Sequence, residues 1–371
     1  MNKLSLLKLT KKMTTLMITS VVFFPIYSWA GSTSGADFLK IPIGAETASL
    51  GQASSAMSSG VSALNSNPAG ISQKPKQVSN PTALFSFSHQ DHFQQTTFDH
   101  VGVVFPGNIK SKNVTYGFNI LRLSYGKEEL RGENREVLGH AESSDLAIGG
   151  AFGLQIQGVQ IGSQVKIIRQ SLAGETANGY ALDLGVLSRT SIRGLQIGGS
   201  IRNLGPQMNF ISENFKLPLT LSLGAAFQVK GPLTFALDLI ERPHQKQFSV
   251  AFGSEFRASS SVALRAGYLT KLADSVVNNR KTDSNSSSIG NLNGLTGGIG
   301  IKLSQFSIDY AMTPFADLGN VQTFTLSTWF GGTKPASTPV FMGPDTKEQP
   351  SKDLYKIDSP AHEPFWDKLK F

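Results

Sequence analysis

The chain has 371 residues and no cysteine, which excludes a disulfide framework and a thiolate metal site. Only 16% of the residues are charged, and no run after the first thirty residues approaches the roughly 18 apolar residues of a membrane-spanning helix. The formal net charge is +8 at pH 7, but four lysines within the first twelve residues supply half of it, so the charge gives little support for nucleic-acid binding.

The first thirty residues have the form of a secretory signal peptide. The four lysines are followed by an apolar run at residues 16–28 and by the small-x-small site Ser28-Trp29-Ala30, which predicts cleavage after Ala30. The alternative is a single membrane anchor. Because the apolar run is short and Pro25 interrupts it, we expect export instead.

Residues 31–81 consist mostly of small and turn-forming residues, and they include the stretch ALNSNPAGIS at residues 63–72. The residue before a proline is disfavoured in the helical region, and asparagine is a good helix cap. Asn67 is therefore expected to cap a short helix that starts at Pro68.

From about residue 82 onward, apolar residues alternate with small, polar or charged residues. In the segment 233–239, three leucines and a phenylalanine alternate with Thr, Ala and Asp. A period of two is typical of a strand with one apolar face. It predicts strands at residues 82–90, 95–106, 113–124, 143–156, 158–169, 178–189, 192–203, 218–229, 231–241, 246–257, 261–271, 293–303, 305–312 and 319–330.

The connections between these strands are sorted by length. One side has only short turns, whereas the other has long polar loops at 125–142, 204–218 and 272–293. Outer-membrane barrels have this arrangement, with both chain ends in the periplasm. The sequence therefore predicts an all-β fold, a 14-stranded antiparallel transmembrane β-barrel over residues 82–330. The alternative is a soluble or secreted all-β protein, which has no reason to sort its loops.

The last predicted strand supports the barrel. Its alternate residues Phe324, Leu326, Thr328 and Phe330 suit a lipid-facing row, and the intervening Thr and Ser residues suit a wet interior. We expect the barrel-assembly machinery to recognise this strand, which ends at Phe330. Residues 331–371 are rich in proline and charge and show no period, which predicts a flexible periplasmic tail.

The predicted number of strands indicates where residues 31–81 lie. Eight-stranded barrels fill their interior with side chains, and barrels of about 16 strands leave an aqueous channel. The lumen would thus be a pore unless a segment occupied it, and the small residues of 31–81 suit close packing against a wall. We expect an N-terminal plug, or hatch, whose motif is Gly44, Gly51, Asn67, Pro68, Ala69 and Gly70.

Six charged residues fall at positions predicted to face the lumen. We expect several of them to contact residues 31–81 or a passing polar group; the alternative is that they are ordinary residues of a polar interior. They are Lys166, Asp183, Arg202, Asp238, Arg265 and Asp309.

Two parts of the sequence resemble a known family. The block at residues 35–72, with its Gly44-Ala45 and Asn67-Pro68-Ala69-Gly70 positions, resembles the N-terminal signature of the PorV/PorQ family. Residues 306–330 are similar to the closing hairpin of that family. These are outer-membrane barrels related to the FadL-type long-chain fatty-acid transporters.

The resemblance implies one of two functions at the outer membrane of a Gram-negative-type bacterium. The first is FadL-like uptake of a hydrophobic molecule. The alternative is a PorV-like accessory or shuttle role in a type IX-like secretion system, in which the long loops bind exported proteins. Outer-membrane lipid is an expected partner in either case, and nucleic acid is not.

The sequence has no arrangement typical of an enzyme. It lacks a Gly-x-Ser-x-Gly elbow and a phosphate-binding loop, and its six histidines have no metal-ligand spacing on the predicted strands. We therefore expect neither catalysis nor a cofactor.

Overall fold

The computed structural model describes residues 34–73, 81–109, 112–131, 134, 136–229, 231–271, 294–315 and 319–331. The chain divides into two compact units, 1–337 and 338–371, and all described residues belong to the first. The predicted leader, the predicted loop at 272–293 and the predicted tail beyond Gly331 lie outside the described residues.

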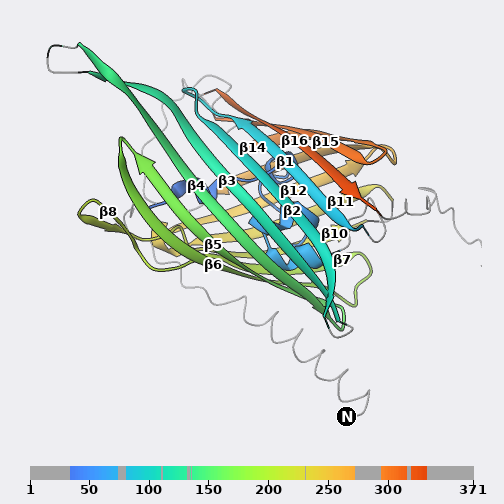
Figure 1. Cartoon of the computed structure of the whole chain (residues 1–371). Coiled ribbons are helices and arrows are strands. Elements are labelled where there is room, and N and C mark those ends of the chain that lie inside the picture. The colour runs from blue at the N-terminus through green and yellow to red at the C-terminus, as the bar shows by residue number, and fades with distance from the viewer. Residues whose placement is uncertain are drawn as a thin grey trace, which may run out of the picture. The chain divides into compact units, whose positions relative to one another are not determined.

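Fourteen antiparallel strands close into a barrel (Figure 1). Each pairs with its neighbours along the chain, and β1 also pairs with β16, from Ala83 opposite Phe330 to Asp91 opposite Gln322. Closure leaves no unpaired edge, which a strand surrounded by lipid requires. The strands are β1 Ala83–Asp91, β2 Thr97–Ile109, β3 Lys112–Arg131, β4 Val137–Ile156, β5 Val159–Leu172, β6 Glu175–Arg189, β7 Leu195–Leu204, β10 Thr220–Gln228, β11 Leu233–Arg242, β12 Gln247–Arg257, β13 Val262–Lys271, β14 Leu295–Leu303, β15 Phe306–Pro314 and β16 Asn320–Phe330.

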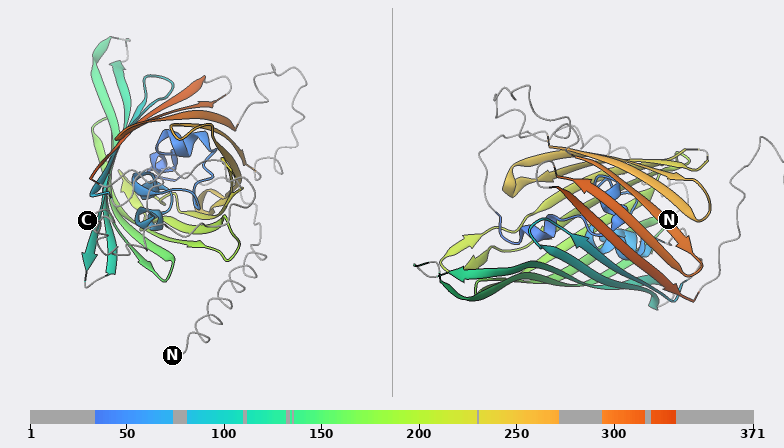
Figure 2. Two further views of the ribbon diagram at one scale, coloured as in Figure 1. Left: turned by 90° about the vertical axis from the view of Figure 1, so that its right-hand side faces the viewer. Right: turned by 90° about the horizontal axis from the view of Figure 1, so that it is seen from above.

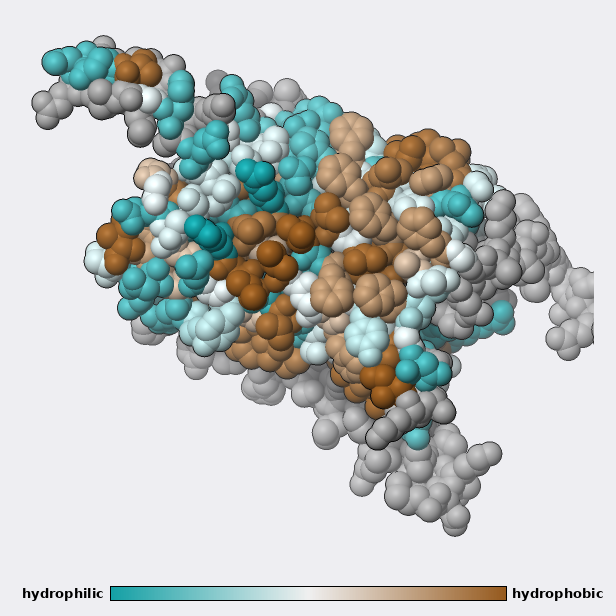
Figure 3. All heavy atoms as spheres, viewed as in Figure 1, coloured by the Kyte–Doolittle hydropathy of each residue, from teal (hydrophilic) through white to brown (hydrophobic). Residues whose placement is uncertain are grey.

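The two faces of the wall follow the alternation in the sequence. In β16, Phe324 and Leu326 are 46% and 42% exposed, whereas Thr323 and Thr325 between them are buried. Apolar side chains gather in a broad area over the outside of the strands (Figure 3). The wall is thus apolar outside and largely polar inside, the reverse of a soluble protein.

The predicted fold class is confirmed, and all fourteen predicted strands are present. The interpretation of residues 125–142 as a loop is wrong, because β3 continues to Arg131 and β4 begins at Val137. The two strands pair with each other beyond the rest of the wall and project from it (Figure 1). This part of each strand has no second strand neighbour and is not part of the closed wall, so it needs no apolar face and its sequence carries no period of two.

A similar correction applies to the predicted loop at 204–218. It contains a two-stranded hairpin of its own, formed by β8 Met208–Phe210 and β9 Glu213–Phe215. The hairpin is not part of the barrel wall.

The described part of the N-terminal segment, residues 34–73, lies inside the ring of strands (Figure 2). It forms four short helices and turns: η2 Asp37–Lys40, α2 Ala45–Ser49, η3 Gly60–Asn65 and η4 Pro68–Ser72. A further short 3-10 turn, η5 Pro243–Gln245, connects β11 and β12. Among the described residues, no helix has the length and apolar character needed to cross a membrane.

Candidate functional site

The N-terminal segment packs directly on the backbone of the strands, because the wall carries glycine where the two meet. A Cβ atom placed on Gly162 would lie 2.2 Å from the carbonyl oxygen of Pro68, and one on Gly267 would lie 2.2 Å from the amide nitrogen of Gly51. Any larger residue would occupy the space of the segment. Comparable approaches of under 3.0 Å occur at Gly102, Gly117, Gly153, Gly185, Gly198, Gly253 and Gly298.

Asn67 connects three parts of the lumen. Its Oδ1 accepts a hydrogen bond from the backbone N–H of Ala69 (3.2 Å), so it caps η4, which begins at Pro68 as predicted. Its Nδ2 donates to the carbonyl oxygens of Ser55 (2.7 Å) and Val186 (3.0 Å). A single buried side chain thus joins two turns of the segment to β6.

The glycines of the predicted motif have distinct roles. Gly44 and Gly51 have φ values of 81° and 61°, which favour glycine. Gly70 lies against the turn before η3, where an added Cβ would be 2.3 Å from the carbonyl oxygen of Ser58. Pro68 and Ala69 are buried on β5 and β6.

Asp238 and Arg202, both predicted lumen charges, hydrogen-bond to the segment. The Asp238 carboxylate accepts from the backbone N–H groups of Ser54 (3.0 Å) and Ser55 (2.8 Å). Arg202 donates from Nη1 to the carbonyl oxygen of Asn65 (2.6 Å). Asp238 is 1% exposed, so it replaces water for two backbone donors that would otherwise be unpaired.

Two more predicted charges form an ion pair between the neighbouring strands β5 and β6. Lys166 Nζ lies 2.8 Å from Asp183 Oδ2, and Lys166 also donates to the side chain of Asn203. The other oxygen of Asp183 accepts from the backbone N–H of Asn203 (2.7 Å). The pairing of β6 with β7 becomes irregular between Leu182 and Leu184, so this polar cluster connects strands where their ladder ends.

The remaining pair belongs to a cluster that the sequence reasoning did not fully recognise. Arg265 contacts Asp309 Oδ1 (2.7 Å) and Glu255 Oε2 (3.0 Å). Glu255 also contacts Arg257 (3.1 Å). Glu255 was missed although it alternates into the lumen with the inward residues of β12, which was the available signal.

An apolar compartment lies at the end of the lumen that carries the long connections, and the sequence analysis missed it. Phe38 and Leu39 of η2 are buried there and are 2% and 8% exposed. Inward side chains of the wall surround them, together with two residues from the 205–219 connection. The wall residues are Phe98, Leu121, Leu123, Ala147, Ile168, Ala177 and Ala181, and the connection supplies Met208 and Leu217.

Cavities remain between the segment and the wall. One of about 100 Å³ is lined by Val61, His100 and Trp329, among others, and one of about 120 Å³ surrounds Arg265 and Asp309. A larger cavity of about 450 Å³ lies at the opposite end of the lumen from the apolar compartment. It is bordered by Met57, Gln73, Leu195, Arg189 and Arg193.

The histidines are dispersed. His89 contacts Asp99 (2.6 Å), and His244 hydrogen-bonds to the carbonyl oxygen of Leu217. Partial burial lowers the pKa of His92, in the turn after β1, although the charge of Asp91 opposes this shift. Within the described ranges, no three His, Asp or Glu side chains come together as metal ligands would.

No protein-family model matches the chain, and no curated protein sequence matches it. Among solved structures, the monoaromatic hydrocarbon channel CymD is similar with a TM-score of 0.55 and 11% identity, over 78% of this chain and 97% of that one. The toluene transporter TbuX of Ralstonia pickettii gives a TM-score of 0.51 and 13% identity, over 78% and 98% of the two chains. The chain shares the fold of these two barrels. A FadL homologue of Pseudomonas aeruginosa is a looser match, with a TM-score of 0.46 and 11% identity over 77% and 98%.

Replacing Gly162 by alanine tests the close contact between wall and segment. The new Cβ would meet the backbone of Pro68, and we expect a loss of about 1–3 kcal/mol in the free energy of unfolding. The control is Gly150→Ala on the outward face of β4, where the nearest atom would be 3.7 Å away. Urea unfolding of the two variants measures the difference, and equal stabilities would contradict the contact.

Asp238→Ala tests the anchoring of the turn at residues 54 and 55. Loss of the carboxylate leaves two buried N–H groups unpaired, at about 1–3 kcal/mol each. We expect hydrogen exchange at Ser54 and Ser55 to become roughly tenfold faster or more. Asp309→Ala removes a lumen carboxylate that pairs with Arg265 instead, and it should leave these two amides unchanged.

Proposed function

We propose that this chain is an outer-membrane channel, without enzymatic activity, for FadL-like uptake of a hydrophobic small molecule. Residues 34–73 act as a plug in its lumen, and both ends of the chain face the periplasm. The shared fold with CymD and TbuX supports a membrane barrel.

The apolar compartment is the observation that carries the proposal. Barrel interiors are normally polar, yet Phe98, Leu121 and Ile168 point inward and are almost fully buried. An apolar lining inside a membrane barrel is suited to a ligand that leaves water on entry. In the described conformation Phe38 fills this compartment, so a ligand must compete with it or lie beside it.

The anchoring of the segment favours passage around the plug rather than its ejection. Residues 51–70 are fixed by the glycine contacts, by Asn67 and by Asp238. Movement of residues 51–70 out of the lumen would break all of these contacts together. The cavities beside the segment are then the natural spaces through which a small molecule moves.

A PorV-like role in protein secretion stays the alternative, and it rests on the N-terminal motif. In that role, the β3–β4 ribbon that projects from the barrel would be a surface for the exported protein (Figure 1). Recognition of the strand ending at Phe330 by the barrel-assembly machinery is likewise a prediction.

Toluene binding tests the proposed function directly. Phe38→Ala should leave a ring-sized space in the apolar compartment, which toluene can fill. We expect toluene to raise the Tm of this variant and to bind it roughly tenfold more tightly than the unsubstituted chain. The control is Phe93→Ala in the turn after β1, where the side chain is 39% exposed. If toluene stabilises neither the chain nor Phe38→Ala, the hydrophobic-ligand proposal is wrong.

Two outward leucines test the membrane location. Leu326 lies at the middle of β16, and Leu303 lies at the end of β14, with exposures of 42% and 53%. In a bilayer, arginine at the midplane costs about 2–4 kcal/mol and near the interface about 0–1 kcal/mol. We therefore expect Leu326→Arg to lower stability in lipid vesicles much more than Leu303→Arg. Equal costs would argue against a bilayer centred on these strands.

A further inference from the structure

The cavity of about 450 Å³ that Arg189 and Arg193 border is large enough to hold a ligand of its own. Pockets that bind small molecules typically have volumes of about 300–1,000 Å³. The ends of β6, β7, β10 and β11 and the turn between β6 and β7 form its wall, and residues 56–57 and Gln73 form its inner side. The cavity therefore lies between the N-terminal segment and the wall, at the end of the lumen opposite the apolar compartment.

Two arginines bring positive charge to this cavity. Arg189 is the last residue of β6, and Arg193 lies in the turn that leads to β7. Among the described residues that line the cavity, none is acidic. In the same part of the chain, neither guanidinium forms a salt bridge. Both groups are thus available to an anion that enters the cavity.

The strand order places one carboxylate beside this wall, and that carboxylate is already paired. Glu255 of β12 is opposite Thr234, which lines the cavity from β11. The two oxygens of Glu255 contact Arg257 (3.1 Å) and Arg265 (3.0 Å). Because two guanidinium groups already balance its charge, Glu255 does not offset the two arginines of the cavity, and the cavity attracts anions.

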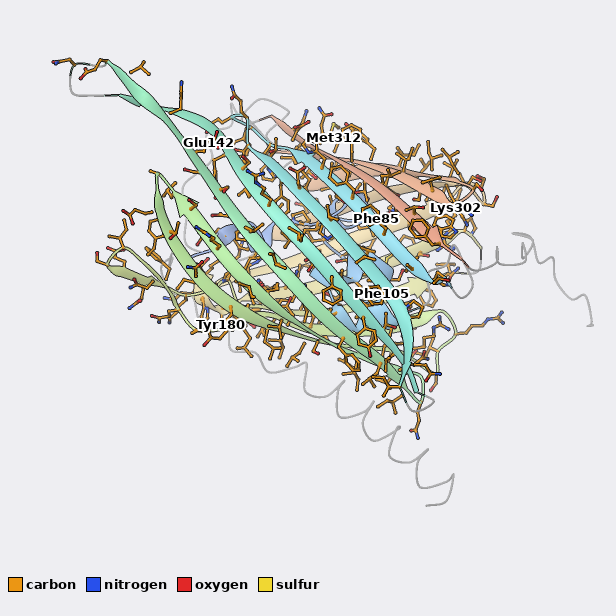
Figure 4. The ribbon with its side chains drawn as sticks, in the orientation of Figure 1. Phe85, Phe105, Glu142, Tyr180, Lys302 and Met312 are labelled. Carbon is orange, nitrogen blue, oxygen red and sulfur yellow. The ribbon has the colours of Figure 1, made fainter. Side chains whose placement is uncertain are left out.

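The pleat of β6 directs Arg189 into the lumen. Tyr180 is exposed on the outside of this strand (Figure 4), whereas Leu187 is buried inside the barrel. Successive side chains of a strand alternate between its faces, so Arg189 shares the inner face with Leu187. Gln196 of β7 is opposite Arg189 and exchanges two hydrogen bonds with Gln73 of the segment (3.1 and 3.4 Å). Polar groups that can bind an anion therefore lie on neighbouring strands.

The cavity also has an apolar part. Met57 is 9% exposed and packs with Leu187 and Ala226, and both Met57 and Ala226 line the cavity. Leu195 and Ile192 add apolar surface from the turn between β6 and β7. A neutral hydrocarbon would make no use of the guanidinium groups, and a free inorganic anion would make no use of the apolar surface. A carboxylate attached to an apolar body uses both.

We propose that this cavity binds a small organic carboxylate with an apolar body. Arg189 and Arg193 contact the carboxylate, because the planar guanidinium matches its two oxygens. Met57, Leu195 and Ala226 contact the apolar body. The site goes beyond the proposed function, since it is separate from the apolar compartment and takes a charged ligand.

Calorimetric titration of the full chain in mild detergent tests the proposal, with benzoate, benzamide and acetate as probes. Benzamide has the ring without the charge, and acetate has the carboxylate without the ring. We expect benzoate to bind roughly tenfold more tightly, or better, than either of the other two. Failure of benzoate to bind, or equal binding of benzoate and one of the other probes, would overturn the proposal.

The variant Arg189→Gln/Arg193→Gln should weaken benzoate binding roughly tenfold or more and leave benzamide binding unchanged. The matched control, Arg122→Gln/Arg169→Gln, removes two exposed arginines from outward positions of β3 and β5 and should keep benzoate binding. An equal loss in the two variants would contradict the assignment. If the first variant does not fold, Arg193→Gln alone, in an exposed turn, should still weaken benzoate binding and not benzamide binding.

Toluene binding by the same samples separates this proposal from the proposed function. If benzoate does not bind while toluene still stabilises Phe38→Ala, only the carboxylate site is wrong. If benzoate binds as expected and toluene stabilises neither the chain nor Phe38→Ala, the carboxylate site stands and the proposed hydrophobic ligand is wrong.

Discussion

Close contact between the backbone of the N-terminal segment and the inward glycines of the wall is the constraint on which the lumen depends. Fourteen strands enclose more space than their own side chains fill, but not enough for a segment with large side chains on every surface. Glycine on the wall and Ala, Ser and Gly in residues 44–60 remove side chains from both partners. The small residues of the wall and those of the segment therefore depend on each other, and a larger residue in either one would displace the other.

The strands could be predicted because the wall has an apolar outer face and a largely polar inner face, so alternation in the sequence records the pleat directly. That signal fails where the constraint is absent. Beyond Ser124 of β3 and before Ser144 of β4 the two strands pair only with each other, and this pairing follows from their being neighbours rather than from alternation. It also fails in the apolar compartment, where Leu121 points inward while Ile120 points outward, so that both faces are apolar and the period disappears.

Alternation identified which charges face the lumen, but it could not pair them. Lys166 and Asp183 meet because β5 and β6 have a particular register, and Asp238 reaches Ser55 across 183 residues of chain. Such contacts depend on strand register and on the path of a segment without a period of its own. Among the described residues, charges of the polar interior pair from strand to strand, as Arg265 does with Glu255 and Asp309.

The distribution of anchors along the segment then limits where the lumen can change. Residues 51–70 are held by close backbone contacts and by buried hydrogen bonds, whose loss would leave buried polar groups unpaired. Around η2 the side chains Phe38 and Leu39 pack by apolar contact, which a hydrophobic molecule can replace without leaving a polar group unpaired. Exchange of one apolar occupant for another is thus least costly around η2, at the end of the lumen that carries the long connections. Under the proposed function, a molecule that enters there would meet residues 51–70 in place, and its route onward would follow the cavities beside the segment.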